Sequence, residues 1–389
     1  MPSLPLHLSP VALAAFIVTA PFAHAATERV VYSFKGGSDG AGPLAALLKV
    51  GGTLYGTTLS GGAAGCQCGT VFKLTKAGAE TVLYAFQGGL DGDAPFAPLI
   101  YVGGTLYGTT YNGGGSDACQ SVCGTVFAIT PAGAETVVYR FPESGTYGIN
   151  PRTSLVNLKG TLYGTAFGEG PNRSGLVFSV TPAGALTIVY AFKGGSDGVA
   201  PSGLIKAGGE LYGTTAGGGS ANCTGGCGTV FAVTPTGAEK VVYTFKGGSD
   251  GYSPTGLIKV GDAFYGTTGA GGGTGCQNIG CGTVFKVTKA GKETVLYAFQ
   301  GGSDGESPTA GPINVGGTLY GTTGSGGATN RGTVFSVTPA GVKTVLWSFQ
   351  AGGDGSGPYA ALINVGGTLY GTTGSGGANE QGTVFAVTP

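Results

Sequence analysis

Short runs of β-branched and aromatic residues, separated by glycines at regular places, dominate the chain. One run, "TLYGTT", follows a Gly-Gly pair and stands in "GGTLYGTT" at 51–58, 103–110, 316–323 and 366–373. A later run, "GTVFAIT", leads through "PAG" into another, "TVVYRF". Such runs are typical of β-strands, and Gly-Gly between "APLIYV" and "TLYGTT" predicts a two-residue hairpin. Apolar residues fall on both faces of the runs, which favours sheets packed between neighbouring sheets.

The same unit of four strand candidates occurs seven times along the chain. Its tyrosines are Tyr55, Tyr107, Tyr163, Tyr212, Tyr265, Tyr320 and Tyr370. A period of about 50 residues with four strands is the size of a propeller blade. We therefore predict an all-β fold, a single seven-bladed β-propeller over residues 26–389. Its units are approximately 30–81, 82–136, 137–187, 188–240, 241–294, 295–344 and 345–389.

The first and last strand candidates complement each other. "TERVVYSF", which begins at Thr27, corresponds to the fourth strand of a unit, and "GTVFAVTP" at the end of the chain corresponds to the third. Pairing these two runs would close the ring and remove an exposed sheet edge. The innermost strands carry small residues where the blades must crowd, namely Ala45-Ala46, Gly203, Gly256, Gly311 and Ala360-Ala361.

The combined motif "LYGTT…GTVFxVTPAG" resembles the Gloeo/Verruco (GloVer) tandem repeat of exported bacterial proteins. The similarity covers nearly all of the chain after residue 25, and seven copies make the motif specific. The resemblance implies an exported propeller. It implies no particular activity.

Residues 1–25 have the pattern of a signal peptide. "PVALAAFIVTA" is an apolar stretch of the right length, and Ala23-His24-Ala25 has the small-x-small form of a cleavage site. We expect the protein to be exported, to the periplasm or the extracellular space. Both histidines, His7 and His24, lie in this segment. The processed chain would lack histidine, which excludes Ser-His-Asp and Cys-His catalysis and histidine-ligated metal sites.

The composition of the chain argues against some classes of binding partner. Only 10 % of residues are charged, and 19 basic residues balance 19 acidic ones, so no electrostatic footprint for nucleic acid is present. No segment after the signal peptide is long and apolar enough to span a membrane. The 82 glycines lie beside the strand runs and indicate turns. We expect a monomer whose partner is a glycan or an extracellular protein.

Eight cysteines occur as four close pairs, all in the loop between the second and third strands. They are Cys66/Cys68, Cys119/Cys123, Cys223/Cys227 and Cys276/Cys281. An even count in an exported chain favours disulfides within each loop. The pairing of Cys66 with Cys68 is strained, because only one residue separates them. The alternative is a four-cysteine zinc site shared by neighbouring blades.

A "GGSDG"-like segment connects most units, on the same face of the ring as the cysteine loops. It carries Asp39, Asp91, Asp197, Asp250, Asp304 and Asp354. An Asp-Gly pair after Gly-Gly is first a turn whose carboxylate accepts local backbone hydrogen bonds. The alternative is a ring of calcium or sugar ligands. We predict no cofactor, with calcium as the alternative. Phe96, Tyr252 and Tyr359 flank these turns and can stack on sugars, although packing against neighbouring loops explains them as well.

The third unit departs from the pattern. Its connection reads "RFPESGTYGINPR" and its loop reads "AFGEGPNRSGL", and it holds three of the five arginines, including Arg140. A local departure from a uniform rule is where a functional site is expected. The simpler interpretation is repeat drift that left a solvated charged patch. The candidate binding residues are Glu143, Tyr147, Asn150, Arg152, Glu169, Asn172 and Arg173.

Three functions fit these observations. The first is a non-catalytic module that binds a glycan or a protein through the loop face. The second is a hydrolase or lyase with Glu143 and Glu169 as paired carboxylates, together with Arg152 and Tyr147. The third is a structural protein of the cell envelope. Fold alone does not decide among them. A quinone-dependent dehydrogenase is disfavoured, because such blades are typically marked by tryptophan and the only one here is Trp347.

Overall fold

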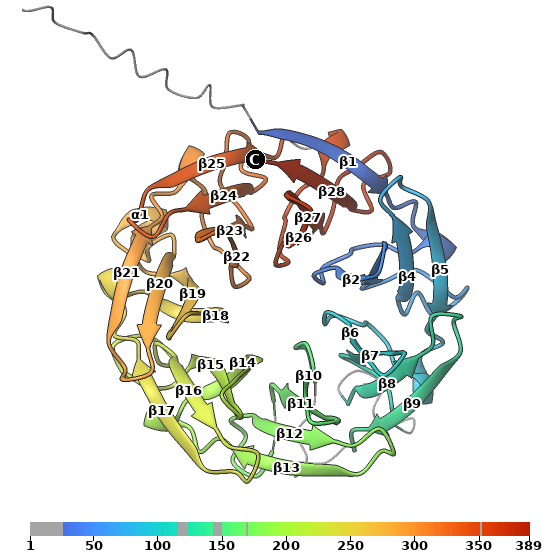
Figure 1. The fold of residues 1–389 in the computed structure, drawn as a ribbon, viewed down its shortest axis with the longest axis horizontal. Helices are drawn as coiled ribbons and strands as arrows, with labels where there is room; N and C mark the ends of the chain where they lie inside the picture. The colour runs from blue at the N-terminus through green and yellow to red at the C-terminus, as the bar shows by residue number, and fades with distance from the viewer. Residues whose placement is uncertain (1–25, 116–122, 143–149, 169, 351) are drawn as a thin grey trace, which may run out of the picture.

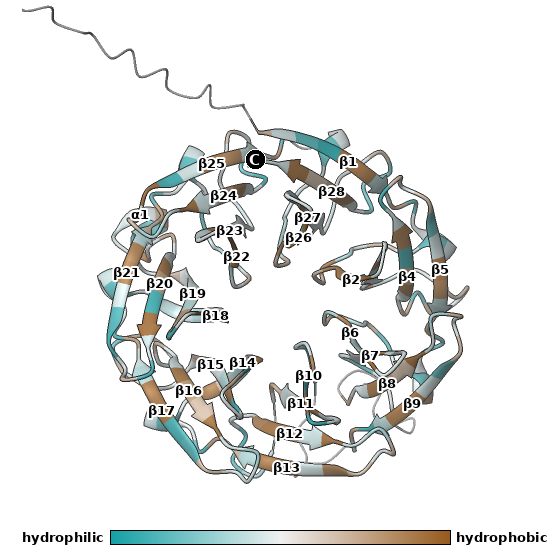
Figure 2. Ribbon diagram, viewed as in Figure 1, coloured by the Kyte–Doolittle hydropathy of each residue, from teal (hydrophilic) through white to brown (hydrophobic). Residues whose placement is uncertain are grey.

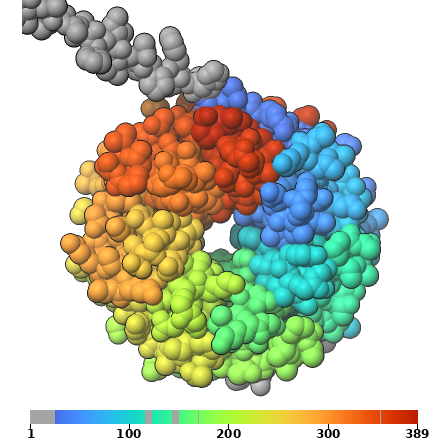
Figure 3. Space-filling model, viewed as in Figure 1, coloured from blue at the N-terminus to red at the C-terminus, as the bar shows by residue number. Residues whose placement is uncertain are grey.

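Seven four-stranded antiparallel sheets surround a central axis in the computed structural model (Figure 1). The structure describes residues 26–115, 123–142, 150–168, 170–350 and 352–389. Each sheet is one blade, and successive strands run from the axis to the rim, as in β2-β3-β4-β5. The space-filling view shows that the ring is open at its centre (Figure 3). The predicted seven-bladed propeller is confirmed.

Strands in equivalent positions have similar bounds. The innermost strands are β2 (Leu48–Val50), β6 (Ile100–Val102), β10 (Val156–Leu158), β14 (Val199–Ala207), β18 (Tyr252–Val260), β22 (Ile313–Val315) and β26 (Ile363–Val365). The second strands are β3 (Thr53–Thr58), β7 (Thr105–Thr110), β11 (Thr161–Ala166), β15 (Glu210–Gly217), β19 (Ala263–Ala270), β23 (Thr318–Thr323) and β27 (Thr368–Thr373). The third strands are β4 (Thr70–Thr75), β8 (Thr125–Ile129), β12 (Leu176–Val180), β16 (Thr229–Val233), β20 (Thr283–Thr288), β24 (Thr333–Val337) and β28 (Thr383–Thr388). The outermost strands are β5 (Glu80–Ala85), β9 (Glu135–Arg140), β13 (Leu186–Ala191), β17 (Glu239–Thr244), β21 (Glu293–Ala298), β25 (Lys343–Ser348) and β1 (Thr27–Ser33).

Helical structure in the described residues is limited to short turns. The 3-10 turns are η1 (Gly37–Asp39), η2 (Gly89–Asp91), η4 (Gly195–Asp197), η5 (Gly248–Asp250), η6 (Gly302–Asp304) and η7 (Gly352–Asp354), and the one α-helical turn is α1 (Gly275–Asn278). Every 3-10 turn contains the aspartate of the connecting segment. No helix in these parts of the chain is long and apolar enough to cross a bilayer.

The ring closes through its first strand. β1 pairs with β28 in antiparallel register from Thr27↔Thr388 to Ser33↔Thr383, and so becomes the outermost strand of the last blade. Figure 1 shows this blue strand beside the red β28. The predicted closure is confirmed, and the edge of β28 is covered.

The glycine of "LYGTT" is required by packing within the blade. Gly56 on β3 lies opposite Phe72 on β4, whose ring covers it. A Cβ on Gly56 would lie 2.5 Å from Cζ of Phe72, closer than any side chain tolerates. The same arrangement recurs in the other six blades, in the pairs Gly108/Phe127, Gly164/Phe178, Gly213/Phe231, Gly266/Phe285, Gly321/Phe335 and Gly371/Phe385.

Those phenylalanines also join the blades. The third strands are mostly hydrophobic, as the brown parts of β12 and β28 show (Figure 2), although β4 and β20 each contain one lysine. Each covering ring meets, edge to face, the phenylalanine that follows the outermost strand of the preceding blade, at 5.0–5.2 Å between centroids: Phe34/Phe72, Phe86/Phe127, Phe141/Phe178, Phe192/Phe231, Phe245/Phe285, Phe299/Phe335 and Phe349/Phe385. All these rings are buried. The core therefore consists of seven hydrophobic clusters, each lying between two neighbouring blades.

Candidate functional site

A buried proline that packs on the preceding blade lies just before five of the innermost strands and inside the other two, β14 and β18. These prolines are Pro43, Pro95, Pro151, Pro201, Pro254, Pro308 and Pro358. Pro95 lies over Gly69, the glycine of "GTV" in blade 1, where a Cβ would come 2.6 Å from the proline Cδ. The other six prolines meet the equivalent glycines in the same way. The glycine of "GTVF" is thus the position on which the proline of the next blade packs, and a side chain there would collide with the proline ring.

The residue before each proline fixes the segment further. It has positive φ in all seven blades: 55° at Ala94, 57° at Asn150, and 53–66° at Gly42, Ala200, Ser253, Ser307 and Gly357. Its backbone amide donates to a carbonyl of the preceding blade, as Ala94 does to Cys68 at 2.9 Å and Ser307 to Cys281 at 2.9 Å. Non-glycine residues in this region carry backbone strain, which surrounding contacts must hold and which tends to accumulate at functional sites.

The residue after each proline faces the central opening of the ring. These seven equivalent residues are Leu44, Phe96, Arg152, Ser202, Thr255, Thr309 and Tyr359, and we call them the mouth residues. All seven line one cavity of about 500 Å³. Below them the small residues predicted for the inner strands, such as Ala45, Gly203 and Ala361, line the same cavity, as expected.

The mouth residues differ in chemistry although the rest of the repeat is nearly uniform. They include two aromatic rings, one guanidinium, three hydroxyls and one aliphatic side chain. Phe96 and Tyr359 are 38 % and 47 % exposed, so these rings are available for contact. Arg152 is the only charged residue among the described residues that line the cavity.

Arg152 lies partly buried against an aromatic ring. Its guanidinium carbon is 3.6 Å from the centroid of Phe167, a cation–π distance. Burial lowers the pKa of Arg152 from its usual value, and nearby Tyr111 partly offsets this effect. No carboxylate of the described residues forms an ion pair with it. The contact with Phe167 orients the planar group, and the N–H donors at its edges have no hydrogen-bond acceptor among the described residues.

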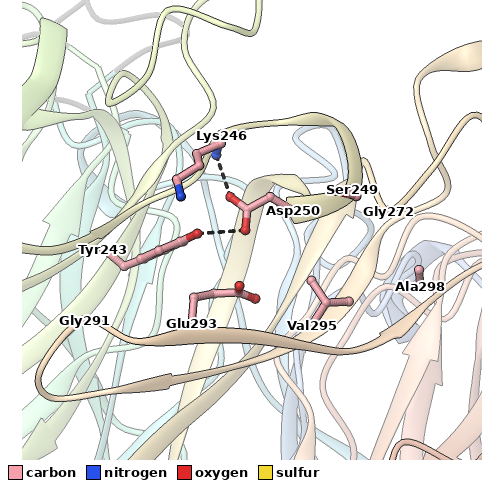
Figure 4. A pocket seen from close by; sticks show the side chains of 9 residues that line it. All are labelled: Tyr243, Lys246, Ser249, Asp250, Gly272, Gly291, Glu293, Val295 and Ala298. Carbon is pink, nitrogen blue, oxygen red and sulfur yellow. Dashed lines mark hydrogen bonds between the residues drawn. The ribbon is translucent and has the colours of Figure 1, made fainter.

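A second cavity, of about 700 Å³, lies at the outer rim between the fourth and fifth blades (Figure 4). The carboxylate of Asp250 accepts hydrogen bonds from the Tyr243 hydroxyl at 2.8 Å and from the backbone amide of Lys246 at 2.6 Å. Glu293, on the first position of β21, faces the same carboxylate. Burial first, and then the charge of Asp250, raise the pKa of Glu293 to about 8.

This pairing of carboxyl groups recurs at four further blade junctions. The pairs are Asp39/Glu80, Asp91/Glu135, Asp197/Glu239 and Asp354/Glu28, and burial with the neighbouring aspartate raises the pKa of each glutamate to about 7. In all five pairs one glutamate oxygen is buried without a hydrogen bond among the described residues. The sequence did not reveal these pairs, because each aspartate lies in the turn that leads into a blade and its glutamate lies at the start of the outermost strand of that blade, about 40 residues away in the chain for pairs such as Asp39/Glu80.

The two remaining junctions show what the pairing requires. At one, Lys343 stands in place of glutamate, and its ammonium group lies 2.7 Å from Oδ1 of Asp304. At the other, Leu186 stands in place of glutamate and the connection of the third unit contains no aspartate. The second carboxyl group is thus replaced by a cation or lost together with its partner.

The aspartates of the connections act as turn residues. Five of the six accept both a tyrosine hydroxyl, from Tyr32, Tyr84, Tyr190, Tyr243 and Tyr297, and a backbone amide four residues before the aspartate. In the sixth, Asp354 accepts a hydrogen bond from the amide of Gln350 and from no other described residue, because Trp347 replaces the tyrosine. Their carboxylates are therefore engaged locally, as the turn interpretation predicts.

The cysteines form bonds within single loops. Cys66 is bonded to Cys68, Cys223 to Cys227 and Cys276 to Cys281. Cys119 lies outside the described residues, so its bond with Cys123 stays a prediction. Since the six sulfurs are bonded in pairs, they do not offer the thiolates that the alternative zinc site needs. Disulfides of this kind are typical of an oxidising compartment.

The candidate residues of the third unit do not converge where they are described. Glu143, Tyr147 and Glu169 lie outside the described residues. Asn150 is buried, and its side-chain amide donates to the carbonyl of Tyr111 at 2.9 Å. Asn172 and Arg173 are exposed in the loop between β11 and β12 and do not line the central cavity. Of the described candidates, Arg152 alone faces that cavity.

The third unit departs inside its blade as well. In the other six blades the last threonine of the second strand shares a hydrogen bond with the first threonine of the third strand, as in Thr58/Thr70 at 2.8 Å. Ala166 and Leu176 replace both threonines in this blade, and both are buried. A polar pair has been replaced by an apolar pair, so no hydroxyl is left unpaired.

These observations define the protein as a seven-bladed β-propeller with a varied ring of side chains at its central opening. A family model described as the Gloeobacter/Verrucomicrobia repeat matches residues 17–226, 123–280 and 274–389. The chain belongs to this family, as its repeat motif indicated. Comparison with curated proteins gave no match.

Several solved structures share the fold at low sequence identity. A computationally designed protein, Ika8, is 13 % identical with a TM-score of 0.50, and the match covers 91 % of this chain and 98 % of that one. A puromycin hydrolase is 13 % identical with a TM-score of 0.53, covering 86 % of this chain and half of the hydrolase. A europium-containing methanol dehydrogenase is 12 % identical with a TM-score of 0.52, covering 93 % of both chains. At these identities the likeness concerns the fold alone.

Proposed function

We propose that this protein is an exported, non-catalytic binding module whose ligand is a glycan, held at the mouth of the central opening. The observation that carries the proposal is the variation of the mouth residues. Seven equivalent positions on a nearly uniform scaffold hold six different residue types, with only threonine occurring twice, and all seven side chains line one cavity. Packing alone would favour one residue type, as it does for the neighbouring proline and glycine.

The chemistry of the mouth supports a sugar. Aromatic side chains offer large, rigid apolar faces, and Phe96 and Tyr359 are both exposed. Ser202, Thr255 and Thr309 add hydroxyl groups around the same cavity. The hydroxyl of Thr309 donates to the carbonyl of Tyr359 at 2.9 Å, and that of Thr255 is bonded to the hydroxyl of Thr267 at 2.7 Å. These two hydroxyls therefore have only part of their hydrogen-bonding capacity left for a ligand. A concave site with apolar walls and a few polar groups is the usual form of a small-ligand site. The backbone before each mouth residue is already held by the proline contact and by the amide hydrogen bond to the preceding blade. Less conformational entropy would therefore be lost when a ligand binds.

Binding fits these residues better than glycoside cleavage does. Cleavage uses two carboxyl groups across the scissile bond, and the described residues that line the cavity include no carboxyl group. The hydrolase alternative therefore depends on Glu143 and Glu169. It predicts turnover that is lost in Glu169→Gln.

A glycan array tests the proposal. The wild-type protein is compared with the double variant Phe96→Ser/Tyr359→Ser and with Tyr101→Ser. Tyr101 is a matched control, because it is 42 % exposed on an innermost strand but does not line the cavity. Each glycan that binds is also incubated with the protein and assayed for new reducing ends.

We expect a restricted set of glycans to bind, with at least a tenfold loss in the double variant, no loss in Tyr101→Ser and no new reducing ends. Absence of binding across the array would overturn the proposal, and so would binding that the double variant retains in full. Release of reducing ends would favour the hydrolase.

A further inference from the structure

We infer that the ligand of the mouth is an acidic saccharide, whose carboxylate is bound by Arg152. This inference rests on the proposed function and deepens it by naming the ligand class. It follows from three properties of Arg152: its place in the cavity, its orientation against Phe167 and its lack of a charged partner among the described residues.

The first property is the isolation of the charge. Arg152 is the only charged residue among the described cavity-lining residues, which are otherwise aliphatic, aromatic or hydroxylic. The whole chain carries 19 basic and 19 acidic residues, so no broad positive field attracts anions. Selection of an anion at the mouth would therefore depend on this one side chain.

The second property is the position of the guanidinium group. Stacking at 3.6 Å on Phe167 fixes its plane and covers one face. The planar fork of N–H donors matches a carboxylate in a bidentate manner, and partial burial strengthens such a pair relative to one in open water. An ammonium group would supply the charge but not the fork.

The third property is the cost of leaving the group unpaired. A partly buried cation loses hydration, and burial is the main cause that lowers the pKa of Arg152. Where an arginine serves only the fold, a carboxylate or a backbone carbonyl usually takes its donors. Arg140 illustrates this, since its Nε donates to the carbonyl of Leu90 at 2.9 Å on the rim. Arg152 has the opposite arrangement: one face of its guanidinium group contacts Phe167, and its N–H donors form no hydrogen bond with any of the described residues.

The neighbouring mouth residues suit the remainder of such a ligand. Phe96 and Tyr359 offer faces for sugar rings, and Ser202 adds a hydroxyl group at the same cavity, whereas the hydroxyl of Thr255 is already hydrogen-bonded to that of Thr267 at 2.7 Å. A hexuronate unit combines a ring, hydroxyl groups and one carboxylate. It would meet each of these groups without requiring a second cation.

The test is a calorimetric titration with an oligogalacturonate and with the same oligosaccharide as its methyl ester. The two ligands share rings and linkages and differ in charge. The proteins are the wild type, Arg152→Gln, Arg152→Lys and the control Arg140→Gln, and the thermal midpoint of each variant confirms folding.

We expect the acid to bind at least tenfold more tightly than the ester, and this preference to vanish in Arg152→Gln. Arg152→Lys should retain only part of the preference, and Arg140→Gln should retain all of it. The preference should also shrink as salt is raised from 50 to 500 mM. Equal binding of acid and ester by the wild type would overturn the inference, and so would an unchanged preference in Arg152→Gln.

The two proposals fail in different ways. If the array shows only neutral glycans bound at Phe96 and Tyr359, the acidic ligand is wrong and the binding function stands. If no glycan binds, the proposed function itself is wrong.

Discussion

The glutamate of each carboxyl pair at the blade junctions makes the stability of the folded ring depend on pH. Glu293 faces Asp250, with the Tyr243 hydroxyl and Lys246 beside them (Figure 4). Its pKa is raised to about 8 in the folded protein and is ordinarily near 4.5. Between about pH 4.5 and pH 8, Glu293 therefore keeps its proton in the folded protein, whereas it has lost that proton in the unfolded chain. The stabilisation is complete below about pH 4.5 and is lost as the pH rises through 8.

Replacing Glu293 with glutamine tests this link, because an amide resembles the protonated carboxyl group at every pH. We expect the thermal midpoint of Glu293→Gln to equal that of the wild type at pH 5 and to exceed it by about 1–3 °C at pH 9. Thermal denaturation at the two pH values measures the difference. An equal shift at both pH values would show that Glu293 is not protonated in the folded protein.

The junction of Lys343 supplies the reverse experiment. Lys343→Glu would place a second carboxyl group beside Asp304, the arrangement that five other junctions already hold. The variant should therefore fold, and it should lose more stability relative to the wild type at pH 9 than at pH 5. A loss that does not depend on pH would mean that the ion pair alone explains the effect.

At the scale of the strand, the uniform parts of the repeat are packing requirements. Gly56 accepts the ring of Phe72 from the next strand, and Gly69 seats the proline of the next blade. Gly52, by contrast, has open space where a Cβ would lie. The glycines of one short motif thus serve different purposes.

Gly56→Ala should destabilise the protein by about 1–3 kcal/mol, the usual cost of overpacking a core, because the Phe72 ring must shift. Gly52→Ala in the same blade is the matched control and should change stability by less than about 0.5 kcal/mol. Urea unfolding measures both. Equal effects would show that the ring of Phe72 moves aside without cost.

The sequence predicts elements better than it predicts sites. Strand composition, the seven tyrosines and the complementary ends predicted the blades and the closure by β1, because these follow from local pattern and repetition. The site required the ring itself. Arg152 and Arg173 were both predicted as binding residues of one site on the third unit, whereas the structure places Arg152 in the central cavity and Arg173 on an exposed loop.

The signal for the mouth was nevertheless present in the sequence. Aligning the residue after each "P" of the connections gives Leu, Phe, Arg, Ser, Thr, Thr and Tyr, a variable column beside a constant one. Pattern alone could not show that seven positions about 50 residues apart meet at one opening. The carboxyl pairs, such as Asp39 with Glu80, were hidden for the same reason.

At the scale of the molecule, the constant and variable positions have separate roles. The ring is held together by the phenylalanine pairs between blades, by the prolines packed on glycines of the preceding blade and by the pairing of β1 with β28. The mouth residues take no part in these contacts between blades and differ from one blade to the next. Binding sites are commonly built from variable residues that a rigid scaffold holds in place, as the ring holds the mouth residues here.

The most direct test of this account is a crystal structure of the protein with an oligogalacturonate. We predict electron density for the sugar at the mouth of the central opening, with a carboxylate bound to the guanidinium group of Arg152 and sugar rings against Phe96 or Tyr359. A sugar bound at the outer rim or on the β11–β12 loop, with the mouth empty, would contradict it.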